Sequence, residues 1–339
     1  MPIEPLVLTP GEPGGVGPEI TAKAWAALHG DPGNCFYLIG DAGFLRARCE
    51  AAGVGVPVRR ITSAQEAKAV FPQALPVLHR PLAHAPQTGS FDSANAAWVI
   101  SAIDEAVAAC LGGTAAGMVT CPIQKEALYA AGFKHQGHTD YLASLAERQG
   151  HTVSEVMMLV GGGLRAVPVT VHIAIKDVPA RLSGAAIEAQ ARVTDHALRT
   201  FFGIAEPRLA MTGLNPHAGE NGSMGREEIE IIIPAIKRLQ AEGLHVRGPL
   251  PADTAFFPQE RATYDAILCM YHDQALIPVK TLDFHGGVNV TLGLPFIRTS
   301  PDHGTALALA GTGKAHAESL VAAIRLARAM AFNSESRPS

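Results

Sequence analysis

The chain has 339 residues, and its 31 acidic against 27 basic side chains give a formal net charge of −4. This balance lacks the concentrated positive charge of nucleic-acid-binding proteins, so we expect no nucleic-acid partner. Hydrophobic residues make up 47% of the chain and charged residues 17%, which suits one large α/β unit or about two domains with a sizeable core. Fourteen histidines, against 2 Trp and 5 Tyr, are the unusual feature.

The cysteines and the apolar segments indicate where the protein is found. Residues 1–5 have neither the basic stretch nor the apolar run of a secretory signal. The weakly polar stretch 106–119 is shorter than a membrane span and is interrupted by glycines. The five cysteines never form Cys-x-x-Cys, which disfavours a disulfide framework and a cysteine-type zinc site. We therefore expect a cytoplasmic globular protein that spans no membrane.

In the first part of the chain, short apolar runs alternate with helical patterns. The predicted elements are a strand over 5–9, a helix from Pro18 to Leu28, a strand over 35–40, a helix over 42–52, a helix over 93–111, a strand over 117–120 and a helix capped by Thr139.

The second part continues with further strands and helices. The predicted elements are strands over 156–160 and 167–175 joined by a glycine turn, a helix over 183–202, a strand over 208–212, an isoleucine-rich helix over 229–239 that Pro234 should break or kink, strands over 266–271, 275–281 and 288–292, and a helix over 315–332. This alternation predicts an α/β fold with a largely parallel sheet, and two clusters of strands predict two lobes with a cleft between them.

Three histidines occupy similar places, in or just beyond the ends of predicted strands: His172, His217 and His272. In open α/β sheets, ligands bind beyond the carboxyl ends of the strands. Three neutral imidazoles converging there would form an open metal site with positions left for substrate or water. Spacing alone leaves open the alternative of three unrelated histidines, because no pair has a local signature such as His-Glu-x-x-His. Asp273 could orient the neighbouring histidine, or could be an exposed loop carboxylate.

Two further groups of polar residues suit an anionic ligand. His138 and Thr139 stand at the start of a predicted helix, where an anionic group is stabilised. Lys280, Asn289 and Arg298 are spaced nine residues apart on or beside predicted strands, and the two cations could neutralise a carboxylate or phosphate. The alternatives are a plain helix cap at Thr139 and ordinary surface charge at the cations.

Three common motifs for nucleotides and nucleophiles are absent from the sequence. The loop 11–17 is not Gly-x-Gly-x-x-Gly, and neither a P-loop nor Gly-x-Ser-x-Gly occurs. A standard Rossmann dinucleotide site is therefore not supported. The residues that would contact a dinucleotide, and the general base, stay unassigned.

One long stretch, residues 289–306, has the sequence NVTLGLPFIRTSPDHGTA and closely resembles the 4-hydroxythreonine-4-phosphate dehydrogenases of vitamin B6 biosynthesis. Four shorter motifs resemble the same family in the same order: GGVGPE at 14–19, GHTD at 137–140, LNPHAGE at 214–220 and YHDQ at 271–274. The matching motifs extend from residue 9 to 306, so the resemblance covers nearly the whole chain.

The resemblance implies a two-lobed α/β/α fold similar to that of isocitrate and isopropylmalate dehydrogenases, with the active-site cleft between the lobes. On this basis we expect residues 1–132 and 300–339 to form the first lobe. Residues 133–299 would form the second lobe, with the metal ligands and the interface of a homodimer.

The resemblance also implies the ligands. One divalent metal per subunit (zinc, magnesium or cobalt) would be held by His172, His217 and His272, one of the three coming from the partner subunit. The residues that match the family's substrate contacts are His138, Thr139, Lys280, Asn289 and Arg298. Family members oxidise the C3 hydroxyl of 4-phosphohydroxy-L-threonine with NAD or NADP, and the resulting keto acid loses carbon dioxide to give 3-amino-2-oxopropyl phosphate.

Small departures from the family pattern leave the substrate open. The first glycine loop has PGGVGPE where many members have PAGIGPE, and Gln124, Asp140 and Pro301 replace the commoner Asn, Glu and Val. None of these removes a ligand. Relatives with the same metal site oxidise D-threonate or D-erythronate 4-phosphate, or aromatic cis-dihydrodiols. A metal-dependent hydrolase or lyase without a dinucleotide, and a non-catalytic phosphometabolite-binding protein, are the alternatives from other classes.

Overall fold

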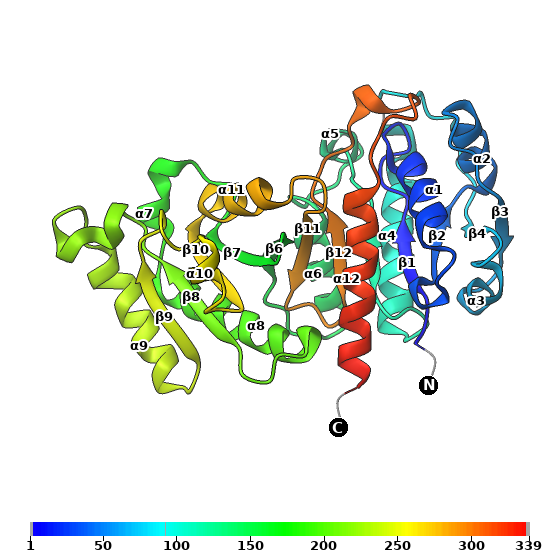
Figure 1. Cartoon of the computed structure of the whole chain (residues 1–339). Coiled ribbons are helices and arrows are strands. Elements are labelled where there is room, and N and C mark those ends of the chain that lie inside the picture. The colour runs from blue at the N-terminus through cyan, green and yellow to red at the C-terminus, as the bar shows by residue number, and fades with distance from the viewer. Residues whose placement is uncertain (1–2, 92, 337–339) are drawn as a thin grey trace. The chain divides into compact units, whose positions relative to one another are not determined.

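The computed structural model describes residues 3–91 and 93–336. Contacts within the chain divide these residues into two compact units, each with a sheet and helices (Figure 1). The first unit contains the chain up to Val153 and the segment Leu294–Phe332, and the second contains Ser154–Gly293 and the residues from Asn333. The α/β fold class predicted from the sequence is confirmed.

The first boundary lies at Val153, whereas the sequence placed it at residue 132. The difference arises because α6 (His138–Arg148) packs on α4 (Ala96–Leu111) in the first unit. The Tyr141 hydroxyl on α6 donates to the Asp104 carboxylate on α4 at 2.5 Å.

The second boundary lies at Gly293, whereas the sequence placed it at residue 299. The reason is strand pairing, because β12 (Arg298–Pro301) runs parallel to β5 (Met118–Thr120) in the first unit. Residues 133–153 and 294–299, expected in the second lobe, therefore belong to the first unit.

The sheet of the first unit has the strand order β3-β4-β2-β1-β5-β12, and every pair in it is parallel. The other strands are β1 (Leu6–Thr9), β2 (Phe36–Gly40), β3 (Val58–Ile61) and β4 (Leu75–His79). The other helices are α1 (Gly17–Leu28), α2 (Ala42–Ala51), α3 (Ala67–Val70), α5 (Lys125–Ala130) and α12 (Glu318–Glu335). The central strands β1, β2 and β5 are buried along their whole length, as expected for a parallel sheet covered on both faces.

The segment Ser93–Leu111, which includes α4, is the one described helix long and apolar enough by length and composition to cross a membrane. It packs against β1, β2 and β5 of the first unit and buries a stripe of apolar side chains there: Val99, Ala102, Ile103, Ala106 and Val107. Its outer face carries Glu105, which pairs with Arg80 at 2.5 Å. The apolar character of this helix is therefore explained by its packing in the core of the first unit.

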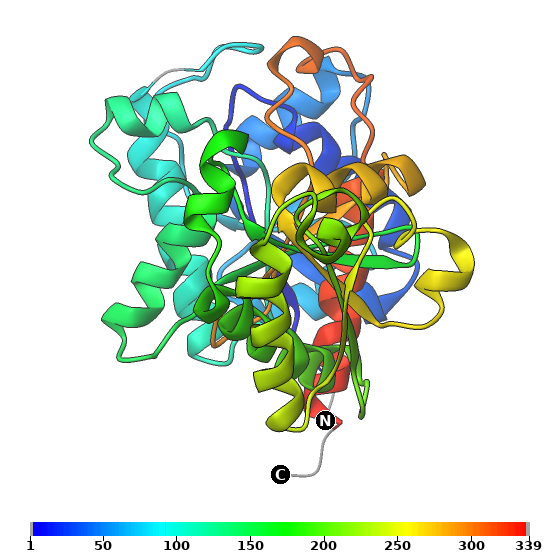
Figure 2. The same cartoon turned by 90° about the vertical axis from the view of Figure 1, so that its left-hand side faces the viewer.

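The sheet of the second unit has the strand order β11-β6-β7-β10-β8-β9. Strand β6 is antiparallel to β7 and β11, and the remaining pairs are parallel. The strands are β6 (Val156–Gly161), β7 (Leu164–Thr170), β8 (Arg208–Thr212), β9 (His245–Leu250), β10 (Ala266–Tyr271) and β11 (Val288–Leu292). The helices are α7 (Val178–Arg181), α8 (Gly184–Phe202), α9 (Ile233–Ala241), α10 (Pro258–Arg261) and α11 (His272–Leu282). Helix α9 packs on the edge strand β9 (Figures 1 and 2).

Several predicted elements of the second unit are confirmed and one is wrong. The glycine turn between β6 and β7 has positive φ at Gly162 and Gly163. The predicted strand over 275–281 is the helix α11, because its buried residues Ala275 and Val279 lie four apart on one helical face while Ile277 is 62% exposed.

Two differences between predicted and observed element ends concern site residues. Strand β7 ends at Thr170 and not at residue 175, because the chain turns at His172 with a φ of 49°. Helix α6 begins at His138, with Gly137 before it, so Thr139 lies inside the first turn and is not the cap.

Candidate functional site

The three predicted metal ligands all follow neighbouring strands of the second unit. His272 is the first residue of α11, directly after β10, and His172 lies two residues beyond the end of β7. His217 lies in the turn after β8. Because β7, β10 and β8 are adjacent and parallel, their carboxyl ends meet at one edge of the sheet. Ligands of open α/β sheets bind at this edge.

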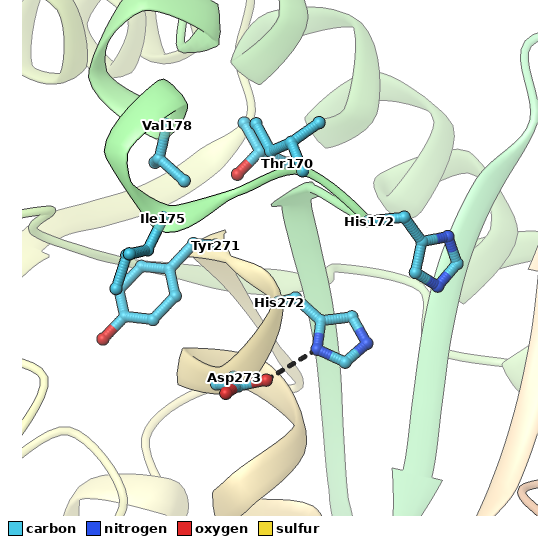
Figure 3. A pocket seen from close by; sticks show the side chains of 8 residues that line it. Thr170, His172, Ile175, Val178, Tyr271, His272 and Asp273 are labelled. Carbon is cyan, nitrogen blue, oxygen red and sulfur yellow. Dashed lines mark hydrogen bonds and ion pairs between the residues drawn. The ribbon is translucent and has the colours of Figure 1, made fainter.

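Two of these histidines lie close together. The ring centroids of His172 and His272 are 5.5 Å apart, with an angle of 44° between the ring planes. Figure 3 shows both imidazoles directed away from Tyr271. They border a cavity of about 240 Å³ whose lining residues are Thr170, His172, Ile173, Ile175, Val178, Tyr271, His272 and Asp273. This cavity places two imidazoles where a small ligand can reach them.

Asp273 holds the ring of its neighbour. Its Oδ1 lies 2.7 Å from His272 Nδ1, so the imidazole can donate from Nδ1 to the carboxylate (Figure 3). A carboxylate at one ring nitrogen fixes the tautomer and leaves Nε2 as the nitrogen available to a metal.

His217 lies in a left-handed turn. Residues 217–221 all have positive φ, and four of them are not glycine. Each left-handed non-glycine residue costs about 1–2 kcal/mol, so this turn must be held by its surroundings. His172 also has a positive φ of 49°. Two of the three predicted ligands therefore lie on backbone of a kind that clusters at functional sites.

The structure brings two of the three histidines together in one chain. Over residues 3–91 and 93–336, no group of three or more His, Cys, Asp or Glu side chains is gathered as a metal site. His217 does not complete such a group with His172 and His272.

The first unit contains a buried cation at the end of its sheet. Arg298, at the start of β12, donates through Nε and Nη2 to the Thr120 hydroxyl at the end of β5, at 3.2 and 2.7 Å. Burial lowers the pKa of Arg298 to about 10, so the guanidinium stays charged at neutral pH. A buried guanidinium of this kind suits a carboxylate or phosphate.

His138 lies in the same region of the first unit. Burial, followed by the positive charges of Arg298 and Lys125, lowers the pKa of His138 well below its usual value. Its Nε2 is buried and has no hydrogen-bond partner among the described residues. A buried nitrogen of this kind is free to hydrogen-bond a ligand. Thr139 follows in the first turn of α6.

Lys125 is a nearby cation that the sequence analysis did not select. A Cβ on Gly137 would lie 3.6 Å from its Nζ, which places the ammonium beside the start of α6. The sequence held one signal, because Lys125 follows the predicted strand 117–120 by five residues. Loops after strands of this kind carry ligand contacts.

The two remaining predicted substrate contacts lie in the second unit. Asn289 is in β11, and its Oδ1 is buried without a hydrogen-bond partner among the described residues. Lys280 lies on α11 and not on a strand, with its Nζ 5.9 Å from the centre of the Phe284 ring. Of the five predicted substrate contacts, His138, Thr139 and Arg298 thus belong to the first unit.

Comparison with known proteins identifies the family. The family model described as pyridoxal phosphate biosynthetic protein PdxA matches residues 33–327. The chain belongs to the PdxA family.

Relatives of this family are similar over nearly the whole chain. The 4-hydroxythreonine-4-phosphate dehydrogenase of Caulobacter vibrioides is 52% identical over 333 residues, covering 98% of each chain. The enzyme of the same name from Paracoccus denitrificans is 51% identical, covering 96% of this chain and 98% of its own.

Solved structures of similar enzymes have the same fold. A 4-hydroxythreonine-4-phosphate dehydrogenase from Klebsiella pneumoniae is 38% identical with a TM-score of 0.87, covering 97% of this chain and 98% of its own. A terephthalate 1,2-cis-dihydrodiol dehydrogenase from Burkholderia xenovorans is 30% identical with a TM-score of 0.65, covering 96% of this chain and 98% of its own. The fold is therefore shared by enzymes whose names state different substrates.

Proposed function

We propose that this PdxA-family chain is a 4-hydroxythreonine-4-phosphate dehydrogenase of pyridoxal phosphate biosynthesis. It would oxidise the C3 hydroxyl of 4-phosphohydroxy-L-threonine with NAD or NADP, and the keto acid would lose carbon dioxide to give 3-amino-2-oxopropyl phosphate. The observation that carries this proposal is the buried Arg298 beside a neutral His138 whose Nε2 has no partner among the described residues. Such a site suits an anionic, hydrogen-bonding substrate.

The second unit supplies donors that fit a divalent metal. His172 and His272 lie with ring centroids 5.5 Å apart, and Asp273 holds the His272 ring through Nδ1. Nitrogen donors of this type suit zinc and cobalt, and magnesium is the third candidate. His217 would complete the set, with one of the three histidines supplied by the partner subunit. When bound, the metal would polarise the substrate hydroxyl and the nicotinamide would accept the hydride.

The chain's own residues would bind and orient the substrate. Arg298 and Lys125 would neutralise its phosphate or carboxylate, and His138 would hydrogen-bond it as a neutral imidazole. Thr139, Lys280 and Asn289 would supply further contacts, and the unpartnered Oδ1 of Asn289 can accept a hydrogen bond from a substrate group.

A second copy of the chain would complete the site as a homodimer. Several large apolar side chains that follow β7 or lie on and after α11 are exposed: Ile173, Ile175, Ile277, Leu282 and Phe284. Large exposed apolar patches are typical of surfaces that bind another protein, and these residues are candidates for such a patch. We propose that a second copy covers it and contributes a metal ligand. The five free cysteines are consistent with a cytoplasmic location.

An absorbance assay tests the proposed function. Purified protein, NAD or NADP and 4-phosphohydroxy-L-threonine should produce reduced cofactor, and chelation should abolish the activity until zinc, magnesium or cobalt is restored. His272→Ala should be inactive, whereas His245→Ala, an exposed residue on β9, should retain activity. Failure of the wild-type protein to reduce either cofactor with this substrate would contradict the proposal.

A second candidate substrate comes from the structural comparison. The Burkholderia xenovorans dihydrodiol dehydrogenase shares 30% identity and nearly full coverage with this chain. The same assay therefore includes a cis-dihydrodiol, together with D-threonate and D-erythronate 4-phosphate. Arg298 predicts that substrates with a phosphate or carboxylate are preferred to a dihydrodiol that carries neither, because its guanidinium then has no anionic partner. A metal-dependent hydrolase or lyase would give product without reduced cofactor.

A further inference from the structure

The turn that carries His217 is built around a buried carboxylate. Glu228 is 2% exposed, and its Oε1 accepts hydrogen bonds from the backbone N–H groups of Leu214 and Asn215, each at 2.8 Å. Its Oε2 accepts a bond from the Asn215 side-chain amide at 3.0 Å. Glu228 forms no ion pair within the part of the chain that the structure describes. The carboxylate is thus satisfied by the segment just before His217.

Two glycines show how closely the turn fits this carboxylate. A Cβ on Gly213 would lie 3.1 Å from Glu228 Oε1, and a Cβ on Gly219 would overlap Oε2. Gly219 also has a φ of +78°, which an L side chain rarely adopts. The turn therefore approaches both carboxylate oxygens of Glu228 closely, and His217 lies between the two glycines in the sequence.

A local irregularity directs Glu228 inward. Residues Glu228–Ile232 form a π-helical turn ahead of α9. This turn buries Glu228 and Ile232 and leaves Ile229 39% exposed. Single π turns of this kind are frequent at functional sites. Here the turn aims a charged side chain at the backbone that precedes a predicted metal ligand.

We infer that Glu228 is a positioning residue for His217, and that its carboxylate holds the left-handed turn that presents this histidine to the divalent metal. The inference rests on the metal site of the proposed function. The left-handed run from 217 to 221 is strained, and charge-assisted hydrogen bonds to the backbone are strong enough to hold it. Without the carboxylate, the turn can relax and His217 loses its fixed direction.

The first test measures metal affinity in the metal-free, full-length protein. Cobalt(II) is titrated into wild type, Glu228→Gln and Glu230→Gln, with the absorption of bound cobalt as the readout. Glu230 is the matched control, because it lies in the same π turn but is exposed and pairs with Arg226. Glu228→Gln should bind cobalt about 10- to 100-fold more weakly, as is typical when a group that orients a ligand is lost. Glu230→Gln should bind within about twofold of wild type.

A second variant and a wild-type measurement keep the inference testable if Glu228→Gln folds poorly. Gly219→Ala should weaken cobalt binding in the same way, because its Cβ would overlap the carboxylate. In the metal-free wild type, the backbone amides of residues 214–215 should exchange hydrogen slowly. Rapid exchange of these amides would overturn the inference whatever the variants do.

The outcomes separate this inference from the proposed function. If wild type and Glu230→Gln bind no cobalt, the metal site itself is overturned and the inference with it. If wild type binds cobalt and a folded Glu228→Gln or Gly219→Ala binds it equally tightly, only the inference is overturned. Melting curves of the metal-free proteins identify which variants are folded.

Discussion

Gln274 Nε2 donates to the Gly213 carbonyl oxygen at 2.8 Å, which ties the start of α11 to the end of β8. The Gln274 Oε1 accepts from the Thr212 hydroxyl and from the Met270 backbone N–H, each at 2.7 Å. The side chain is 8% exposed and uses both ends of its amide. One glutamine therefore fixes the spacing of two strand ends from which predicted metal ligands follow.

Replacing Gln274 with leucine should strongly destabilise the protein. The substitution removes the partner of the Met270 N–H and of the Gly213 carbonyl, whereas the Thr212 hydroxyl keeps a bond to the Leu268 carbonyl. Each buried unpaired group costs about 1–3 kcal/mol, so we expect a loss of about 2 kcal/mol or more. Urea unfolding of the metal-free protein measures it. Gln240→Leu is the control. Gln240 is an exposed residue of α9, and its side chain makes a single bond, to the Val246 carbonyl of β9. Equal stability of Gln274→Leu and wild type would show that the network contributes little.

Asp273→Asn should weaken metal binding without loss of the fold. The carboxylate lies 2.7 Å from His272 Nδ1, and an amide is a weaker acceptor for the ring N–H. Loss of such a partner costs about 10- to 100-fold in metal affinity, which competition with a metal-binding dye measures. Asp253→Asn, on an exposed segment before α10, should bind metal as wild type does. Unchanged affinity in Asp273→Asn would mean that the carboxylate does not orient a ligand.

Most of the central strands could be predicted from the sequence. Strands β1, β2, β8 and β10 are short apolar runs bounded by polar or glycine residues, and buried parallel strands take this form. The edge strand β3 escaped prediction because its exposed Arg59 and Arg60 give no apolar signal. Helix α11 was predicted as a strand because its apolar residues are dense, and its register became visible only through burial at Ala275 and Val279.

The site was predictable where it depends on strand ends and not where it depends on packing. His272 directly follows an apolar run, so its place at the edge of the sheet could be inferred from the sequence. Glu228 could not be selected, since its role depends on segments that meet only in the fold. Lys125 had one signal, its place five residues after a predicted strand, and its approach to the start of α6 is visible only in the fold. A carboxylate 11 residues after His217 has no local pattern that distinguishes it from its exposed neighbour Glu230.

His138 should make the stability of the protein depend on pH. Its pKa in the folded protein lies well below the ordinary value of 6.5, through burial and then the charges of Arg298 and Lys125. Below pH 6.5, His138 therefore binds a proton in the unfolded chain but not in the folded protein. The free energy of unfolding is unaffected by this difference above pH 6.5. It falls as the pH decreases below that value, by at most about 1.4 kcal/mol per pH unit for one proton.

A comparison of wild type with His138→Asn measures that effect. The free energies of unfolding of the two proteins are measured from pH 5 to 8. Only wild type loses stability through His138 as the pH falls. If the variant is the less stable protein at pH 8, the two free energies should therefore become more similar toward pH 5. The other histidines are common to both proteins and cancel in the difference. A difference in stability that stays constant over this range would contradict the assignment of a depressed pKa.

Pairwise mixtures of inactive variants test the shared metal site. Under the proposed dimer, His172→Ala, His217→Ala and His272→Ala are each inactive, and two of the three pairwise mixtures should regain activity. In these two mixtures, one variant lacks the histidine that a subunit gives to its partner's site and the other lacks a histidine of its own site. Their heterodimer has one intact site of two. Because about half of the dimers in an equal mixture are heterodimers, activity should approach about one quarter of wild type. The mixture that stays inactive identifies the two histidines supplied by one subunit. With subunit exchange confirmed, no recovery in any mixture would exclude a site divided between two chains.

Lys125→Met should weaken substrate binding more than it slows the chemical step. The ammonium lies beside the start of α6, where its charge contributes to the depressed pKa of His138. Under the proposed function it pairs with the substrate's phosphate or carboxylate in a partly solvated place. Loss of one such charge-assisted hydrogen bond should raise KM about tenfold, equivalent to about 1.4 kcal/mol, with kcat changed less.

Lys134→Met, an exposed lysine in the loop before α6, is the matched control and should leave KM unchanged. Steady-state kinetics at fixed ionic strength separate the two constants, and an equal KM for Lys125→Met and wild type would remove Lys125 from the substrate site.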